Sequence, residues 1–388
     1  MNDALAAEDA YVLPTYVKFP FALERGAGCW VWDEAGRKYL DLYGGHAVAA
    51  LGHCPPEVAV ALERQSRRLL FYSNLVYSRA RAEAAKALVE FCGENGSQVF
   101  FCNSGAEANE NAMRIARMVT GRAKIVAAEG GFHGRTAAAI AATGAKYRAG
   151  LPGLGADVVH VPFGDADAAA KALDGAAAFL LEPIQSMAGA ATPPPGYLAA
   201  LQAACERAGA LLIFDEVQTG LGRVGERSAG RAYGVRPHLQ TFAKALASGV
   251  PAGAVLAVPE VARRVKPGQL GSTFGGGPLA CAAIAATLKT ISARRLWENA
   301  AAMEMLIRTT FRHPRLQEIR GRGLLLGLVL DGPAKPVLAA LLQRGILAGG
   351  ADDPSVIRLL PPLTVGPEEI AFLRTALLDS FASGAAAP

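Results

Sequence analysis

Two acids stand at the end of an apolar run, where a carboxylate could take part in chemistry. Residues 211–220 read LLIFDEVQTG, so that Asp215 and Glu216 follow four apolar side chains. If the run is a strand of an α/β sheet, its carboxyl end is where ligand groups usually lie. A carboxylate buried there needs a cation or a strong hydrogen-bond donor as its partner. An acid that merely caps the next turn is the alternative interpretation.

Lys244 stands among small and apolar residues in the segment TFAKALASG. Desolvation lowers the pKa of an amine, so a lysine in such surroundings would offer an uncharged nitrogen suited to a Schiff base. Taken alone, the pattern also fits a lysine whose side chain extends from a helix into solvent. A role for Lys244 therefore depends on the residues that surround it.

Residues 100–117, FFCNSGAEANENAMRIAR, predict a strand, a tight turn and a helix. Ser104 and Glu107 have the spacing of a capping box, which a well-capped helix explains without any ligand. A phosphate site is the other interpretation. Gly105 and Ala106 would leave the first N–H groups of the helix open to an anion that the helix dipole favours. Residues 271–277, GSTFGGG, are a second candidate anion clamp or a flexible loop.

Residues 220–225, GLGRVG, match the glycine pattern of dinucleotide-binding proteins directly after an apolar run. The segment that follows, ERSAGRAYG, makes a poor apolar helix. No acid lies about 20 residues further on to hold a ribose. These two departures argue against a nicotinamide-dependent oxidoreductase.

The elements that must position these residues alternate along the middle of the chain. Apolar runs at residues 98–101, 125–127, 178–181 and 211–214 are each followed by an Ala-rich helical stretch. This alternation predicts buried parallel strands with crossover helices, an α/β layer sandwich. The fold class we expect is therefore α/β, with a large, mostly parallel sheet.

The two ends of the chain have a different texture. Residues 29–42 predict two short strands about a turn, and strands near 324–330 and 355–360 precede a last helix from 367 to 381. We expect a large domain over 50–285. A smaller α+β domain would be formed by 1–49 and 286–388 together, with a frayed tail.

Composition excludes several other classes of protein. The chain has 388 residues and a formal net charge of +5 without a basic block, which gives no indication of nucleic-acid binding. No apolar run approaches the roughly 20 residues of a membrane helix, and the acidic N-terminus lacks an export signal, so we expect a cytoplasmic protein. The six cysteines form no C-x-x-C pair. We therefore expect no metal site and small buried thiols.

Taken together, these motifs resemble those of the class III, fold-type I aminotransferases, most closely the acetylornithine/ornithine branch. The resemblance covers nearly the whole chain, from residue 33 to residue 358. It rests on FFCNSGAEANE, GGFHGRT, LLEPIQ, LLIFDEVQTGLGR, AKALASGVPAGA and GSTFGG in the family's order. It implies the fold-type I architecture, pyridoxal 5′-phosphate (PLP) as cofactor, and transfer of an amino group from a small-molecule donor to a 2-oxo acid.

The resemblance also implies roles at the cofactor ring. Lys244 would hold the cofactor and move the protons, and Asp215 would pair with the pyridine nitrogen and keep it protonated. Gln218 would hydrogen-bond the ring oxygen. Phe132 would stack on the ring face, a contact that an ordinary core phenylalanine also explains.

The phosphate contacts that the resemblance implies come from two subunits. Ser104, Gly105 and Ala106 would bind the phosphate from the chain's own helix. Thr273 resembles a threonine that reaches the phosphate from the neighbouring subunit. The resemblance thus implies a homodimer with shared active sites.

Two arginines would bind the substrates. Arg135 matches the family arginine that binds the α-carboxylate of an ornithine-type donor, and Arg358 the one that binds the distal carboxylate of 2-oxoglutarate or glutamate. Arginine is the suitable residue type because its guanidinium pairs with a carboxylate through two hydrogen bonds. A surface or interface salt bridge is the alternative for each. His46 falls where related enzymes have a residue that faces the substrate entrance, and an ordinary surface histidine is its alternative.

The sequence departs from the family where EPIQGEGG reads EPIQSMAG, at residues 182–189. In the ornithine and acetylornithine branch the acid at the position of Met187 masks the arginine matched by Arg358. Met187 cannot form that pair. We therefore hypothesise weaker discrimination against glutamate-like donors, or a donor that lacks the ornithine skeleton.

The function that the sequence favours is transamination from an N-acetylornithine-like donor to 2-oxoglutarate, an activity of arginine biosynthesis. A transaminase for 4-aminobutyrate or another ω-amine is the alternative on the same scaffold. A PLP-dependent mutase or decarboxylase is a third, and a requirement for a 2-oxo acid acceptor would separate it. A non-enzymatic binding protein would be expected to lack Lys244 or Asp215, and both are present.

Overall fold

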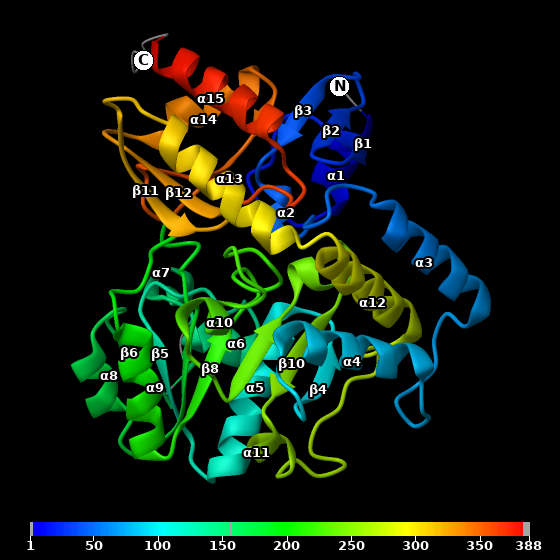
Figure 1. The fold of residues 1–388 in the computed structure, drawn as a ribbon, viewed down its shortest axis with the longest axis vertical. Helices are drawn as coiled ribbons and strands as arrows, with labels where there is room; N and C mark the ends of the chain where they lie inside the picture. The colour runs from blue at the N-terminus through cyan, green and yellow to red at the C-terminus, as the bar shows by residue number, and fades with distance from the viewer. Residues whose placement is uncertain (1–2, 152, 156, 383–388) are drawn as a thin grey trace.

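The computed structural model describes residues 3–151, 153–155 and 157–382, and its largest element is a seven-stranded sheet (Figure 1). The strand order is β4 (Gln98–Cys102), β10 (Gly253–Ala257), β9 (Leu239–Phe242), β8 (Leu211–Asp215), β7 (Ala176–Leu181), β5 (Lys124–Ala128) and β6 (Val158–Val161). Only β10 runs antiparallel to its two neighbours. The prediction of a mostly parallel α/β sheet is confirmed.

Both faces of this sheet are covered, which explains why its strands are solidly apolar. In β8, Leu211 and Ile213 belong to a cluster that includes the buried face of α5 (Gly105–Thr120). Leu212 and Phe214 belong to the opposite cluster, with α8 (Ala166–Ala172) and α9 (Tyr197–Ala208). Successive side chains of a strand point to opposite faces, so one apolar run serves both layers.

Further helices complete the part of the chain that surrounds this sheet. They are α4 (Arg79–Cys92), α6 (Ala137–Ala142), α7 (Ala145–Arg148), α10 (Ala229–Tyr233), the 3₁₀ helix η1 (Lys244–Ala247), α11 (Pro259–Ala262) and α12 (Pro278–Ala293). The prediction that residues 220–225 do not open a long helix agrees with α10, which has five residues.

Two four-stranded sheets lie above the large sheet in Figure 1. One joins β1 (Leu23–Ala27), β2 (Trp30–Asp33), β3 (Lys38–Asp41) and β13 (Ile346–Leu347), and the other joins β11 (Leu316–Arg322), β12 (Leu325–Leu330), β15 (Val356–Leu359) and β14 (Gly349–Gly350). Because β13 pairs with β3, the two ends of the chain share one sheet. The strands expected in residues 29–42, 324–330 and 355–360 are all present.

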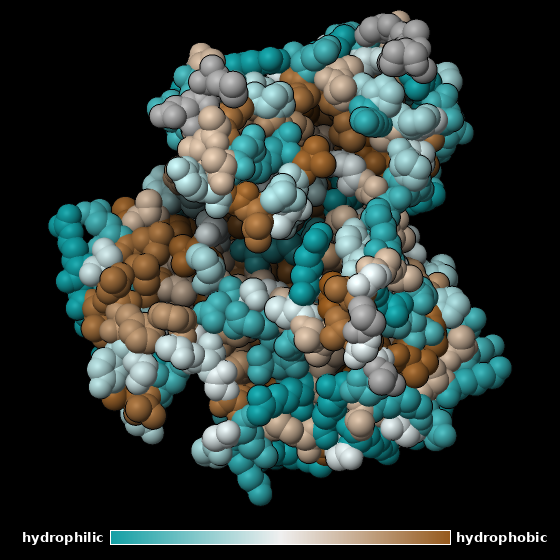
Figure 2. Space-filling model, turned by 180° about the vertical axis from the view of Figure 1, so that it is seen from behind, coloured by the Kyte–Doolittle hydropathy of each residue, from teal (hydrophilic) through white to brown (hydrophobic). Residues whose placement is uncertain are grey.

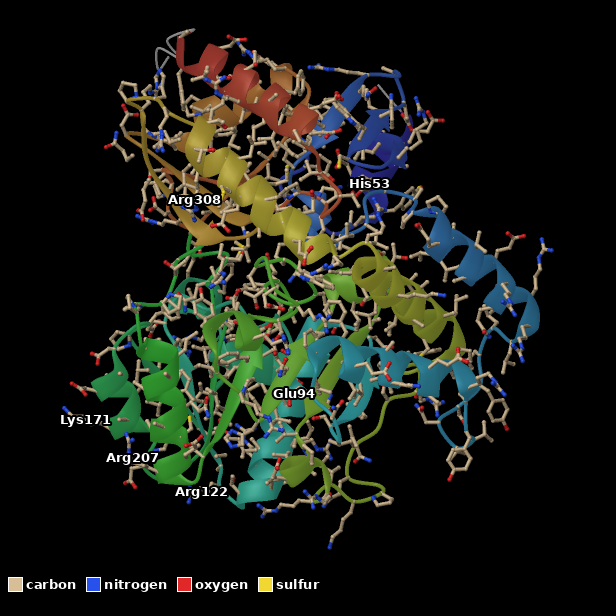
Figure 3. All side chains as sticks on the ribbon, in the orientation of Figure 1. His53, Glu94, Arg122, Lys171, Arg207 and Arg308 are labelled. Carbon is tan, nitrogen blue, oxygen red and sulfur yellow. The ribbon has the colours of Figure 1, made fainter. Side chains whose placement is uncertain are left out.

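The remaining helices precede, connect or follow the strands of these smaller sheets, or lead from them to the large sheet. They are α1 (Asp3–Tyr11), α2 (Gly44–Ala47), α3 (Pro56–Arg68), α13 (Leu296–Thr310), α14 (Ala334–Gln343) and α15 (Pro367–Ala382). Arg308, labelled in Figure 3, fastens α13 to β11 by donating to the carbonyl oxygens of Ile319 at 2.6 Å and Gly321 at 2.7 Å. The last helix matches the sequence prediction.

One expectation from the sequence is wrong, and two others are not tested by the structure. Cys54 is exposed, which contradicts the expectation of buried thiols, while the other five cysteines are buried. The tail from residue 383 onward lies outside the described residues, and the domain division at 49/50 and 285/286 stays a prediction. No helix in the described part of the chain has both the length and the apolar character needed to cross a membrane.

The two acids at the end of β8 have different surroundings. Glu216 accepts hydrogen bonds from the backbone N–H groups of Ala229 at 2.7 Å and Gly230 at 3.2 Å, where α10 begins. Burial raises the pKa of Glu216 to about 7, against the lowering effect of these two donors. The capping interpretation therefore describes Glu216, while the Asp215 carboxylate makes other hydrogen bonds.

This burial predicts a pH dependence of stability. The pKa of Glu216 is about 7 in the folded chain, above the usual value of 4.5, so ionising it costs stability as the pH rises from 4.5 to 7. Glu216→Gln cannot ionise, and its free energy of unfolding relative to wild type should rise across that window by up to about 3 kcal/mol.

Urea unfolding at a series of pH values measures this difference. Glu24→Gln, which removes an exposed carboxylate on β1, is the matched control and should follow wild type. Parallel curves for Glu216→Gln and wild type between pH 4.5 and 7 would contradict the assignment.

Candidate active site

A cavity of about 310 Å³ lies at the carboxyl edge of the large sheet. Its walls come from the turn between β4 and α5, the loop after β5, the end of β8 and the start of η1. Six of the predicted site residues line it, namely Ser104, Gly105, Ala106, Phe132, Asp215 and Lys244. Parallel strands end at a common edge, and this explains how segments more than a hundred residues apart converge here.

Asp215 lies at the buried side of this cavity, with only 2% of its surface exposed. Its Oδ2 accepts hydrogen bonds from Asn109 Nδ2 at 2.7 Å and from His133 Nδ1 at 2.8 Å. Its Oδ1 accepts one from the backbone N–H of Val217 at 3.1 Å. Thr241 in turn donates to Asn109 Oδ1 at 2.7 Å and so fixes the orientation of the amide. Three hydrogen-bond donors thus surround the buried carboxylate of Asp215.

Lys244 opens η1 in a backbone conformation that side chains rarely adopt, with φ at 41°. Such a conformation costs energy and persists only where the surroundings enforce it. Burial lowers the pKa of Lys244, against the raising effects of Asp215 and Glu182. Within the described residues its Nζ donates no hydrogen bond, so a deprotonation-prone amine faces the cavity.

The turn after β4 presents backbone N–H groups to the cavity. Ser104 accepts from the N–H of Glu107 at 3.1 Å, which confirms the capping geometry of α5. The N–H groups of Gly105 and Ala106 have no acceptor among the described residues. A Cβ atom on Gly105 would lie 3.1 Å from the Val217 side chain, so the turn packs closely against the segment after β8. The two free donors at a helix N-terminus can bind an anion.

Phe132 lines the cavity, and its backbone is fixed by a hydrogen bond to Glu182. The backbone N–H of Phe132 donates to Glu182 Oε1 at 2.8 Å. Burial, together with the charge of Asp215, raises the pKa of Glu182 to about 7. The Phe132 ring meets Tyr147 edge-on with centroids 5.1 Å apart. Arg135 is exposed and lies 5.9 Å from the Phe132 ring and 5.8 Å from the Tyr147 ring.

Arg358 on β15 is 2% exposed, yet it forms no salt bridge with a described carboxylate. Its three nitrogens donate to neutral acceptors: Nε to the Gly350 carbonyl at 2.6 Å, Nη1 to Ser186 Oγ at 3.0 Å and Nη2 to Tyr43 Oη at 2.9 Å. The Ser186 hydroxyl in turn donates to Gln218 Oε1 at 2.9 Å. Neither Arg358 nor Gln218 lines the cavity itself, but this chain connects them.

Met187 lies beside the segment that carries Arg358, and it brings no charge. Its carbonyl accepts from the backbone N–H of Asp352 at 2.8 Å. The Asp352 carboxylate binds Lys146 Nζ at 2.8 Å and Tyr147 Oη at 3.0 Å. The Asp352 carboxylate is thus engaged with α7.

Thr273 and His46 lie outside the cavity lining. Thr273 is exposed, while its neighbour Ser272 accepts from Asn103 Nδ2 at 3.3 Å. The His46 ring lies 4.7 Å from the Tyr43 ring. Burial lowers the pKa of His46, with smaller contributions from the cations Arg358 and Lys244.

Sequence reasoning missed several residues that complete these contacts. Asn109 and His133 stand inside the quoted motifs GAEANE and GGFHGRT, so their polar types beside small residues were the available signal. Ser186 stands in the segment that departs from the family, where a hydroxyl replaces a glycine. Tyr43 and Asp352 gave no signal, because their roles depend on contacts with distant segments.

Comparisons with known proteins agree on one family. The profile of the family described as aminotransferase class-III matches residues 11–380. The chain is 42% identical to an acetylornithine aminotransferase of Methanothermobacter thermautotrophicus over 95% of this chain and 96% of the relative. It is 46% identical to one of Streptomyces coelicolor over 90% and 89% of the two chains.

A solved structure extends the likeness to the fold. An ornithine aminotransferase from Toxoplasma gondii, described with partial occupancy of PLP at its active site, superposes with a TM-score of 0.92 at 32% identity. The match covers 98% of this chain and 94% of that one. With a family profile over nearly its whole length and relatives above 40% identity, the chain belongs to the class III aminotransferases.

Proposed function

We propose that this chain uses PLP to transfer the amino group of an N-acetylornithine-like donor to 2-oxoglutarate, giving glutamate. The observation that carries the proposal is that the Lys244 amine and the buried Asp215 carboxylate line the same cavity. The names of the relatives above support the donor. The buried Arg358, which has only neutral partners among the described residues, supports a second substrate with a carboxylate.

The residues present fit the cofactor on which class III aminotransferases depend. An aldehyde needs a free amine, and Lys244 Nζ has no hydrogen-bond partner in the described chain. A phosphate needs donors, and the N–H groups of Gly105 and Ala106 are open at the start of a helix of 16 residues. When bound, PLP supplies an electron sink for the carbanion that forms at the substrate carbon.

The protein's own residues would then divide the work. Asp215, fixed by Asn109 and His133, would pair with the ring nitrogen and keep its proton in place. Lys244, whose pKa burial lowers, would take the proton from the substrate carbon and return it at the neighbouring position. Phe132 would cover one face of the ring and exclude water from it.

The two arginines would orient the substrates. Arg135 is exposed beside Phe132 and Tyr147, where it can meet the α-carboxylate of the donor. Arg358 would bind the distal carboxylate of 2-oxoglutarate through two parallel hydrogen bonds. Since the donor and the acceptor bind in turn, the same site serves both halves of the reaction.

A homodimer is part of the proposal. Apolar surface gathers on the side of the molecule where α3 lies, the left side in Figure 2. The exposed apolar side chains of the segment after α3 and of the loop that carries Thr273 are Leu69, Leu70, Phe71, Tyr72, Leu75, Val76, Tyr77 and Phe274. An exposed patch of this kind marks an interface, and a second copy is the partner that would bring Thr273 to a phosphate.

Lys244→Ala tests the assignment of the amine. Wild-type protein reconstituted with PLP should show a visible absorption band that borohydride bleaches, because the link to an amine is reducible. Lys244→Ala should lack that band and lose transamination by at least about 10³-fold, since proton transfer by the amine is removed. Lys171→Ala, which removes an exposed lysine on α8, is the control. A borohydride-reducible link to the protein in Lys244→Ala would contradict the assignment.

Met187→Glu tests the substrate assignment. A new carboxylate beside the segment of Arg358 should mask that arginine and lower activity on glutamate relative to N-acetylornithine by about tenfold. Initial rates with glutamate, ornithine and N-acetylornithine provide the measurement, with Met187→Gln as the uncharged control. Unchanged ratios among the three donors would refute a role for charge at this position.

Mixed dimers test the role of Thr273. Lys244→Ala dimers and Thr273→Asp dimers should each be inactive, the second because its new charge repels the phosphate. After dissociation and reassociation together, hybrid dimers should regain up to about half of wild-type activity, because one of their two sites is intact. If Thr273 served the site of its own chain, mixing would restore no activity.

A further inference from the structure

The Arg358 side chain is held by hydrogen bonds to neutral groups, and no described carboxylate pairs with its charge. A guanidinium has five N–H groups and no acceptor. Three of them donate to the Gly350 carbonyl, Ser186 Oγ and Tyr43 Oη, one from each nitrogen. In the described part of the chain this leaves one N–H on Nη1 and one on Nη2. A carboxylate that contacts both terminal nitrogens would use these two N–H groups.

Ser186 differs from the other two acceptors because it also donates. Its hydroxyl is fully buried and carries a single proton. Arg358 can only donate to Ser186 Oγ, so the hydroxyl proton must go to the other neighbour, Gln218. The side chain of Gln218 must therefore turn its oxygen toward Ser186, and its NH₂ group is left to face away as a donor.

We propose that Ser186 is a positioning residue that orients two groups of the site with one hydroxyl. It holds the Arg358 fork open toward a substrate carboxylate, and it fixes the Gln218 amide with its NH₂ group available to the ring oxygen of the cofactor. This inference rests on the proposed function above. Because the acceptors of Arg358 are neutral, no carboxylate of the chain needs to be displaced when a substrate carboxylate arrives.

Ser186 and Tyr43 are expected to differ in their effect on the cofactor ring. Both accept a hydrogen bond from Arg358, at 3.0 Å and 2.9 Å. Only Ser186 contacts Gln218. Loss of either hydroxyl should weaken carboxylate binding, whereas only loss of the Ser186 hydroxyl should change the surroundings of the cofactor ring.

Glutarate, an unreactive dicarboxylate, is the probe for the effect of Ser186 on Arg358. Calorimetry on the PLP-loaded protein should show about tenfold weaker glutarate binding in Ser186→Ala and in Tyr43→Phe. KM for 2-oxoglutarate should rise by a similar factor in both variants, while kcat changes less. Ser186→Thr, which restores a hydroxyl, should recover most of the affinity. Ser380→Ala, which removes an equally buried hydroxyl in α15, should bind glutarate like wild type.

The absorption spectrum of the bound cofactor is the probe for the effect of Ser186 on Gln218. Its maximum should shift in Ser186→Ala, return in Ser186→Thr and stay in place in Tyr43→Phe. Should Ser186→Ala bind glutarate as wild type does, the proposal is overturned. It is also overturned if Tyr43→Phe shifts the spectrum as much as Ser186→Ala. Failure of wild-type protein to bind PLP at all would instead refute the proposed function itself.

If Ser186→Ala does not fold, Ser186→Gly replaces it, because glycine is the family's usual residue at this position and leaves no side chain to clash. The same binding and spectral outcomes apply to that variant. Weaker glutarate binding with a shifted spectrum supports the proposal, and wild-type values for both overturn it.

Discussion

A buried carboxylate that needs hydrogen-bond donors from the protein organises this molecule. Asp215 is 2% exposed at the end of β8, and three hydrogen-bond donors compensate for the water it has lost. Two of these donors, Asn109 and His133, come from different crossover connections of the sheet. The third is the backbone just beyond the strand. Displacing any of these segments would leave a charge poorly solvated, so the positions of α5 and of the loop after β5 are tied to that of Asp215.

Arg358 is also buried, and its guanidinium is compensated in another way. Its neutral partners come from β14, from the segment after β7 and from the segment after β3. The N-terminal, middle and C-terminal parts of the chain thus meet at one guanidinium. A network of neutral acceptors keeps the cation oriented while its charge stays available to a ligand. Asp215 is satisfied by the protein alone, whereas Arg358 needs a substrate for full compensation.

The fold could be predicted from sequence because its signals are local. Apolar runs of three or four residues predicted β4, β5, β7 and β8, and the resemblance to the family implied that Asp215 and Lys244 share one site. Local patterns could not assign Glu216 and Asp215 to different roles, since both follow the same strand. They also failed for Cys54, because exposure depends on packing around a turn.

The contacts of Ser186 could not be predicted for a related reason. The departure from the family at this position is visible in sequence, but its meaning depends on Arg358, which lies 172 residues away. The direction of its hydroxyl proton follows only when both neighbours are known. Met187 by itself suggested an unmasked arginine, and the geometry adds that the arginine is also held in place.

The central proposal is that Asp215 and Lys244, which line the same cavity, hold one cofactor between them. A crystal structure of the PLP-loaded protein tests this claim most directly. The account predicts continuous density from Lys244 Nζ to the cofactor, with the ring nitrogen bonded to Asp215 and the phosphate at the N–H groups of Gly105 and Ala106. A cofactor bound with its ring nitrogen away from Asp215, or without a bond to Lys244, would contradict it.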